Sequence, residues 1–356
     1  MHLLDKEMRG FILPLTLWVI AAMGLVSALM SEWVSEATDN ALVIKEKSEA
    51  NLIFSNIRNE LAFIFARRPY TYRGLQVGNF INAPKGGSFN DILNADFTSD
   101  QLIRLDGSSY TMSSDNQYTV RIHDGKGLVN LNTVNLKFLK NMLDTLEVPE
   151  TNHNALADAL LDYRDEDNFR RLSGAEENTY IDLGLYPPSN SFLVTPLEAQ
   201  RILGWTNLSQ LWDKHFERPI ITTCKSSGFN PNTAPKEALS TFIDGVSETN
   251  SNILIALRKE VPLRNTRDVG DSIGVILNEQ PFFFSFLPGR CFIVDLIKNN
   301  TGEHTRFSLT LLPRNASQPW QIDYVYKIPN ETKKPFLSVN TEETFPSPED
   351  IHRRGG

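Results

Sequence analysis

The chain of 356 residues has few of the side chains that build common catalytic and metal sites. Its two cysteines, Cys224 and Cys291, are too few for a cysteine zinc site or a disulfide-dense scaffold. The six histidines show no HExxH or similar spacing, and no glycine-rich loop carries a phosphate signature. No serine or cysteine nucleophile has an adjacent base, so the sequence predicts a protein that is not an enzyme and has no small-molecule substrate.

Positive charge is also scarce. The formal net charge is −8, so the chain as a whole has no electrostatic attraction to nucleic acid or acidic lipid.

The cysteines leave two interpretations open: one disulfide if the domain is exported, or two buried free thiols.

The N-terminal region contains one long apolar run. Residues 11–30 include no charged side chain, and about 20 apolar residues are enough for a helix to cross the hydrocarbon core of a bilayer. Lys6 and Arg9 precede this run, whereas Glu32 and Glu36 follow it. The positive-inside rule therefore predicts a single-pass membrane protein with a cytoplasmic N-terminus and the bulk of the chain on the other side of the membrane.

The junction before the apolar run favours one kind of targeting signal. A short charged leader ends in Gly10 and is followed at once by Phe11, which resembles a type IV prepilin leader that a prepilin peptidase cuts after the glycine. Gly10 has no side chain to clash in a protease cleft. Leu15 stands where most members of the pilin class carry a glutamate that pairs with the neighbouring subunit's N-terminal amine. Its absence suits a subunit at the distal end of a filament.

The remaining pattern predicts an α+β fold. A long N-terminal helix packs on an antiparallel sheet, and a large α-helical, helix-hairpin-helix-like domain is inserted between the strands. The predicted segments are a leader (1–10), a transmembrane helix (11–30), an amphipathic stem (31–68), a first β part (69–127), the inserted helical domain (128–270), a second β part (271–328) and a disordered tail (329–356).

The inserted domain contains an internal repeat. Asn130-Leu-Asn-Thr and, 100 positions later, Asn230-Pro-Asn-Thr each precede a short amphipathic segment. Thr195 and Glu198 have the spacing of a helix capping box. Helix-hairpin-helix units often bind DNA, but residues 128–217 hold 7 Lys and Arg against 14 Asp and Glu. Phosphate contacts require positive charge, so we expect a structural use of the repeat and no nucleic-acid partner.

The motifs of this domain resemble minor pseudopilin K of the type II secretion system, the general secretion pathway protein K family. The resemblance covers most of residues 10–300. One departure is Tyr163, where the family usually has tryptophan. The residues that carry the resemblance are Gly127–Asn132, Leu156–Asp162, Asp165–Asp167, Gly174–Glu176, Tyr180, Asn190, Thr195, Glu198, Gly204 and Asn230–Pro235. It implies a protein of the bacterial inner membrane whose bulk lies in the periplasm. It also implies a structural tip subunit that initiates pseudopilus assembly and so supports protein export across the outer membrane. The implied partners are the I-type and J-type minor pseudopilins and the inner-membrane secretion platform. A minor pilin of a type IV pilus is the alternative, and a membrane-anchored periplasmic helix-hairpin-helix DNA-binding protein is the alternative from another class.

An acidic cluster in the inserted domain is the candidate metal site. Oxygen ligands in a loop suit calcium, and Asp165, Asp167 and Glu176 occupy positions 1, 3 and 12 of a 12-residue stretch. Phe169 and Arg170 stand where an EF-hand needs an acid and a glycine, so this is not an EF-hand. The resemblance implies a calcium-binding helical lobe. Asp162 is a further candidate ligand, and a solvated acidic turn neutralised by Arg164, Arg170 and Arg171 is the alternative.

Overall fold

The computed structural model describes residues 12–77, 102–112, 117–275, 277, 283–315, 317–329 and 345. The chain divides into two compact units, one up to Leu61 and one from Ala62 onward. The leader with Gly10, and Phe11 after it, lie outside the described residues, so their processing stays a prediction.

One long helix, α1 (Ile12–Arg67), makes up the described part of the first unit and ends in the second. It is the one helix in the described part of the chain that is long and apolar enough to cross a membrane by length and composition. It stops just before Pro69, as predicted, because the residue before a proline is pushed out of the helical region. The division of this helix into a span and a stem stays a prediction.

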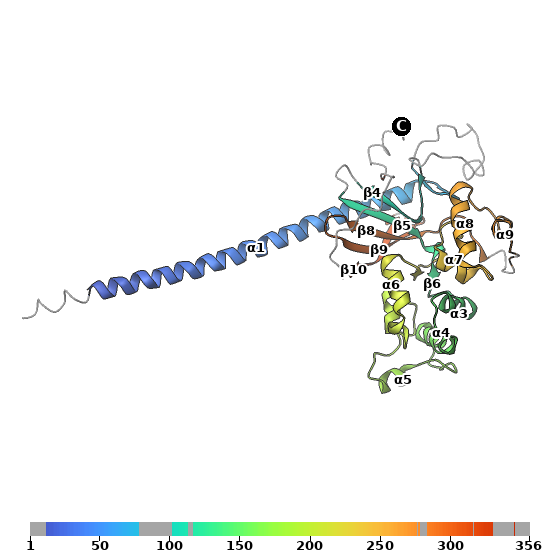
Figure 1. The fold of residues 1–356 in the computed structure, drawn as a ribbon, viewed down its shortest axis with the longest axis horizontal. Helices are drawn as coiled ribbons and strands as arrows, with labels where there is room; N and C mark the ends of the chain where they lie inside the picture. Colours follow the sequence, from blue (N-terminus) through green and yellow to red (C-terminus); the bar gives the residue numbers. More distant parts are fainter. Residues whose placement is uncertain are drawn as a thin grey trace, which may run out of the picture. The chain divides into compact units, whose positions relative to one another are not determined.

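The frame of the second unit is an antiparallel sheet of five strands in the order β10-β9-β8-β5-β4 (Figure 1). A smaller sheet joins three short strands in the order β1-β2-β3. After α1, the described helices all lie between β5 and β8, which confirms the α+β frame with an inserted helical part. The strands are β1 (Tyr70–Thr71), β2 (Gly74–Gln76), β3 (Leu102–Ile103), β4 (Asp106–Met112), β5 (Tyr118–Asp124), β8 (Cys291–Lys298), β9 (Glu303–Leu311) and β10 (Trp320–Ile328).

The two faces of the five-stranded sheet differ in chemistry, since successive strand residues point to opposite sides. One face carries fully buried apolar side chains such as Phe292 and Phe307. The ring of Phe292 lies 4.9 Å from that of Phe65, at the end of α1, and is stacked on that of Tyr70. This face forms the apolar core of the frame.

The opposite face carries a buried polar cluster. Arg121 and Arg306 are the register partners of Asp295 on the two neighbouring strands. Arg306 donates to both carboxylate oxygens of Asp295, at 2.5 and 2.9 Å, and also to the backbone carbonyl of His215 in α6 (Ser209–Glu217). Arg306 holds the pKa of Asp295 well below its usual range, although burial acts in the opposite direction. The cluster therefore joins the sheet to the inserted helices.

Two buried histidines, His123 on this face of the sheet and His215 in α6, should make the fold sensitive to acid. Burial lowers the pKa of His123 to about 3 and also lowers that of His215. Below about pH 6.5 these two histidines bind protons in the unfolded chain but not in the folded chain. The free energy of unfolding therefore falls as the pH drops from about 6.5 toward 3. We expect a loss of about 1.4 kcal/mol per pH unit for each histidine that stays neutral. Chemical unfolding between pH 7.5 and 4.5 measures this slope, and the His123→Gln variant should show a shallower one. Equal slopes would contradict the assignment.

The inserted part consists of short helices and one pair of parallel strands around a continuous apolar core. Phe138 and Phe242 meet edge to face at 5.1 Å, so the first and second halves of the insert share that core. Its elements are η2 (Gly125–Gly127), β6 (Val129–Asn130), α3 (Leu136–Thr145), α4 (Glu150–Arg164), α5 (Glu177–Asp182), η3 (Pro196–Arg201), η4 (Trp205–Asn207), α6, β7 (Ile221–Thr222), α7 (Lys236–Phe242), α8 (Glu248–Glu260) and α9 (Thr266–Ile273).

The Asn-rich repeat seen in the sequence is a repeated structure. In the first copy, Asn132 donates to the carbonyls of Leu193 and Thr223 and accepts from the backbone N–H of Leu193 at 2.8 Å. In the second copy, Asn232 donates to the carbonyls of Leu263 and Phe286 and accepts from the N–H of Leu263, also at 2.8 Å. Each asparagine thus satisfies buried backbone groups of a distant segment, which is a structural role.

An arginine completes each copy. Arg164, at the end of α4, donates to the carbonyls of Leu131 and Val134. Arg258, in α8, donates to the equivalent carbonyls of Pro231 and Ala234. Arg164 therefore bonds the backbone of the asparagine turn, whereas the sequence suggested it as one of the arginines that neutralise the acidic turn.

The capping box expected at Thr195 is wrong. The side chain of Thr195 caps no backbone N–H, and the segment after it is the 3-10 helix η3. Glu198 instead accepts from the backbone N–H of Val194 at 2.8 Å and from the hydroxyl of Tyr163 at 3.3 Å. The carboxylate thus bonds the N–H one residue further back than in a capping box.

Cys224 and Cys291 form a disulfide. Cys224 lies just after β7 in the insert and Cys291 is the first residue of β8, so the bond joins the insert to the sheet. Gly125 packs directly on it, and a Cβ at this position would lie 2.5 Å from the Cys224 sulfur. The interpretation with two free thiols is therefore wrong.

The predicted tail lies outside the described residues except for Pro329 and Phe345. Phe345 is buried, and its backbone N–H donates to the carbonyl of Thr111 in β4 at 2.9 Å. Disorder of the tail and the other segment boundaries stay predictions, although α9 ends three residues beyond the predicted end of the insert.

Candidate metal centre

The candidate centre lies in the connection that follows α4. Asp165 is the C-terminal cap of α4, Asp167 follows in an irregular turn, and Glu176 is the residue before α5. The Asp167 carboxylate accepts the backbone N–H of Phe169 at 2.8 Å, which closes the turn in the way typical of aspartate. The turn and the start of α5 thus bring carboxylates nine to eleven positions apart in the sequence to the same place.

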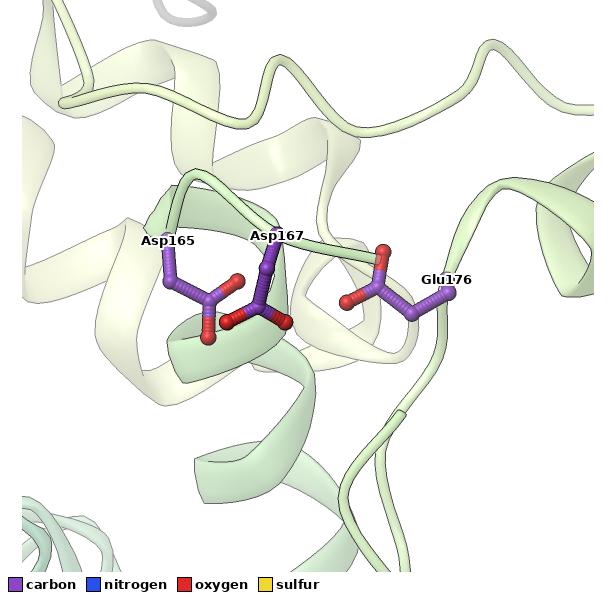
Figure 2. Close-up of side chains that lie close together, drawn as sticks. All are labelled: Asp165, Asp167 and Glu176. Atoms are coloured by element: carbon purple, nitrogen blue, oxygen red, sulfur yellow. The ribbon is translucent and has the colours of Figure 1, made fainter. Parts of the chain in front are cut away.

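Three of the four predicted ligands come together. One carboxylate oxygen each from Asp165, Asp167 and Glu176 lies within 4.8 Å of the other two. Figure 2 shows the three carboxyl groups turned toward a common space, with that of Asp167 between the others. Their exposure differs, since Glu176 is buried, Asp165 half-buried and Asp167 exposed. The group therefore sits at the surface with one ligand inside.

Asp162 makes a different contact. Its carboxylate is fully buried and accepts from the Arg171 side chain at 2.6 Å and from the Arg171 backbone N–H at 3.1 Å. A Cβ at Gly174 would lie 2.0 Å from an Asp162 oxygen, so only glycine allows this close approach. Asp162 thus stabilises the turn through its hydrogen bonds with Arg171, and its carboxylate is not one of the three that lie together.

The arginines neutralise the turn only in part. Arg171 bonds Asp165 at 2.5 Å in addition to Asp162. Arg164 donates to backbone carbonyls, as described above. One oxygen of Asp165 and both oxygens of Glu176 are buried without a hydrogen-bond partner. Unpartnered buried carboxylate oxygens are costly, because nothing replaces the water that they lose.

The electrostatics of Glu176 reflect this shortage of partners. Burial and, to a smaller extent, the nearby charges of Asp162, Asp165 and Asp167 raise its pKa to about 7, and Arg171 offsets only part of this rise. A cation placed among the three carboxylates would supply the missing partner. Because all the donors are oxygens, a hard cation such as Ca²⁺ fits them, and softer metals that prefer nitrogen or sulfur do not.

The centre lies in a segment that only one copy of the repeat contains. In the first copy, 28 residues separate Arg164 from Leu193, whereas in the second copy four residues separate Arg258 from Leu263. The acidic turn is thus an addition to the repeated scaffold. Sequence comparison of the two copies from their Asn-x-Asn-Thr turns would have revealed this addition.

Comparison with known proteins gives a match over the same region. Residues 119–210, which contain the first copy of the repeat and the centre, match the family model for type II secretion system (T2SS) protein K. A comparison with curated proteins finds no match. A chain from the crystal structure of the GspK-GspI-GspJ complex from the enterotoxigenic Escherichia coli type 2 secretion system is similar, with 14% identity and a TM-score of 0.43 over 59% of this chain and 80% of that one. The match to the type II secretion system protein K family thus covers residues 119–210 of the 356-residue chain.

Proposed function

We propose that the chain is a structural subunit at the tip of a type II secretion pseudopilus, where it initiates assembly and supports protein export. The observation that carries this proposal is the family match over residues 119–210. The apolar first part of α1 supports it, because a tip subunit is held in the inner membrane before assembly. Leu15 supports the tip position, since no subunit lies ahead of it to engage a glutamate.

The proposal includes a location and partners. The charge asymmetry around residues 11–30 favours a cytoplasmic N-terminus and a periplasmic bulk. The partners are two other minor pseudopilins, of the I and J type, and the inner-membrane secretion platform. The role is one of assembly and needs no catalysis by this chain.

Processing by a prepilin peptidase tests the proposal. We expect the full chain, co-expressed with the peptidase and extracted from membranes, to lose residues 1–10 and to begin at Phe11. Intact mass spectrometry measures this loss, and Gly10→Leu is the control that should stay uncut, because its side chain fills the space that a glycine leaves in the protease. An uncut wild-type chain beside an active peptidase, or a cut beyond Met30, would contradict the proposal.

We also propose that Asp165, Asp167 and Glu176 bind calcium. When bound, the ion would supply positive charge to carboxylate oxygens that lack hydrogen-bond partners. The three side chains would hold it, and Ca²⁺ accepts further oxygens from backbone or water because it takes about six to eight ligands. Binding would fasten the turn after α4 to the start of α5.

The Glu176→Gln variant should respond in opposite directions with and without calcium. Without metal at pH 8, Glu176 is ionised in a site that raises its pKa to about 7. Its folded pKa exceeds the unfolded one, so this residue costs stability as the pH rises from about 4.5 through 7. The variant removes that cost and should melt at a higher temperature than the wild type, with no difference near pH 4.5.

With calcium at 100 times its dissociation constant, the wild type should gain about 2.7 kcal/mol and the variant much less. Thermal unfolding of the full chain in detergent, with chelator or with calcium, measures both effects. Glu177→Gln is the matched control, because Glu177 is the exposed neighbour outside the group of three. An equal calcium response in wild type and Glu176→Gln would rule out this site.

A further inference from the structure

The segment that carries the acidic turn also exposes an unusual number of large apolar side chains. Among the described residues from Ala62 onward, 14 such side chains are exposed, and eight of them fall between residues 169 and 194. Leu172 is 98% exposed and Phe169 is 83% exposed. Single exposed apolar residues are ordinary on a protein surface, but a cluster of this kind marks an interaction site. The eight residues, named here the apolar segment, are Phe169, Leu172, Ile181, Leu183, Leu185, Tyr186, Phe192 and Val194.

The apolar segment is not needed for the core of the insert. Seven of its eight residues belong to the 28-residue addition in the first copy of the repeat, and Val194 follows just after it. The second copy closes the same connection with four residues. Figure 1 shows α5, in the middle of this addition, at the end of the inserted helices away from the five-stranded sheet. The exposed residues therefore lie where they can meet another molecule without disturbing the fold.

The backbone of this addition is held in place. Asn190 donates to Asn168 at 2.7 Å, which ties the two ends of the addition together and brings the chain near Phe169 close to the chain near Phe192. The N–H of Ser173 donates to Asp158 in α4 at 3.1 Å, and the Tyr180 hydroxyl accepts from the N–H of Leu203 at 2.9 Å. A surface fixed in this way loses little conformational entropy on binding.

The negative charge of the addition favours a partner of positive charge. Between residues 165 and 194, six carboxylates stand against two arginines, a net charge of −4, and one divalent cation bound to the turn would still leave −2. Anionic lipid surfaces are repelled by such charge, whereas a protein segment with basic residues is attracted. We propose that the apolar segment is a docking surface for a protein partner whose contact segment is both apolar and basic.

A groove beside the apolar segment offers a place for such a partner's side chains. It has a volume of about 440 Å³ and is lined by Ser173, next to Leu172, and by apolar residues from α4, from α6 and from the turns after α3 and around η4. These apolar lining residues are Leu146, Val148, Leu156, Leu203, Leu208 and Leu211. An apolar anchor that enters a groove, with charged residues at the rim, is the usual arrangement of a binding hot spot.

Site-specific photo-cross-linking tests this inference in the intact cell. The full chain carries a benzophenone amino acid at position 169 or 172, or at position 253 as a control, because Ile253 is an exposed apolar residue of α8 outside the addition. We expect adducts at 169 and 172, and none at 253, with a protein segment that mass spectrometry identifies as apolar and positively charged. Adducts with lipid, with a second copy of this chain, or with an acidic or uncharged segment would overturn the proposal, as would the absence of adducts.

Binding of the identified segment as a synthetic peptide gives the second measurement. Fluorescence anisotropy with the purified full chain in detergent should show at least tenfold weaker binding for the Phe169→Ser, Leu172→Ser double variant. The Ile253→Ser, Leu257→Ser double variant is the matched control and should bind like wild type, since both residues are exposed on α8. A peptide with its basic residues replaced by glutamate should also bind at least tenfold more weakly. Equal binding by the two double variants, with unchanged circular dichroism, would refute the assignment.

Discussion

The Arg306→Met variant should lose about 3–5 kcal/mol of folding stability, because it leaves the fully buried carboxylate of Asp295 without its main partner. The guanidinium also donates to the backbone carbonyls of His215 and Phe216, in the last turn of α6. These carbonyls have no partner within the helix, and a positive charge there is favourable to the helix dipole. The substitution therefore weakens the sheet and its contact with the insert together.

Denaturant unfolding of the full chain in detergent measures this loss, and three comparisons test whether the buried ion pair is its cause. Lys327→Met removes an ion pair between β9 and its other neighbour, β10, but the Lys327–Glu303 pair is exposed and should contribute at most about 1 kcal/mol. An Arg306→Met, Asp295→Leu double variant removes both charges and should regain much of the loss.

The pH supplies the third comparison for Arg306. The arginine holds the pKa of Asp295 well below its usual range, so the carboxyl group in the single variant takes up a proton more readily. The difference between Arg306→Met and wild type should shrink as the pH is lowered from 7 to 5. A loss below 1 kcal/mol at pH 7, or a loss that does not depend on pH, would contradict a buried ion pair as its cause.

Sequence periodicity was sufficient for the main elements of the fold. The apolar run and the amphipathic stem predicted at 31–68 correspond to α1, and the β parts predicted at 69–127 and 271–328 contain the long strands. These signals are local, because the residues that form one face of a helix or strand are only two to four positions apart in the sequence. The Thr195 region shows the limit of such reasoning, since α-helical and 3-10 turns share the same start signals.

Contacts between distant segments were beyond the reach of the sequence. The repeated asparagines were visible as a motif, but the Asn132 side chain bonds backbone groups 61 and 91 positions away. The cluster around Asp295 draws Arg121 and Arg306 from neighbouring strands and His215 from a helix. The spacing of these residues in the sequence does not predict their contacts, because the contacts depend on strand register and on where the helix packs.

The candidate metal centre falls between these two cases. Residue type and spacing were enough to propose Asp165, Asp167 and Glu176, which the turn does bring together. The same reasoning could not separate Asp162 from them, because that depends on Arg171 crossing the turn to reach it. The burial of Glu176, which leaves its oxygens without partners, also depends on the packing around the turn.

The double variant Cys224→Ala, Cys291→Ala should lose about 4 kcal/mol of stability, in the chain-entropy account of a disulfide that closes a loop of this length. The two cysteines are 67 positions apart, so the bond removes many conformations from the unfolded chain. It also joins the insert to the first residue of β8, the strand that carries Asp295, the partner of Arg306. Thermal unfolding of the full chain in detergent measures the loss.

Reduction of the wild type should reproduce the effect of the double variant only after the protein opens. Both cysteines are buried, so dithiothreitol at a temperature well below the melting point should leave the bond intact. Cys224→Ala alone is the useful control, because it frees one thiol and should lose as much stability as the double variant. A double variant that melts within 2 °C of wild type would mean that packing and the Asp295–Arg306 pair hold the insert to the sheet without help from the disulfide.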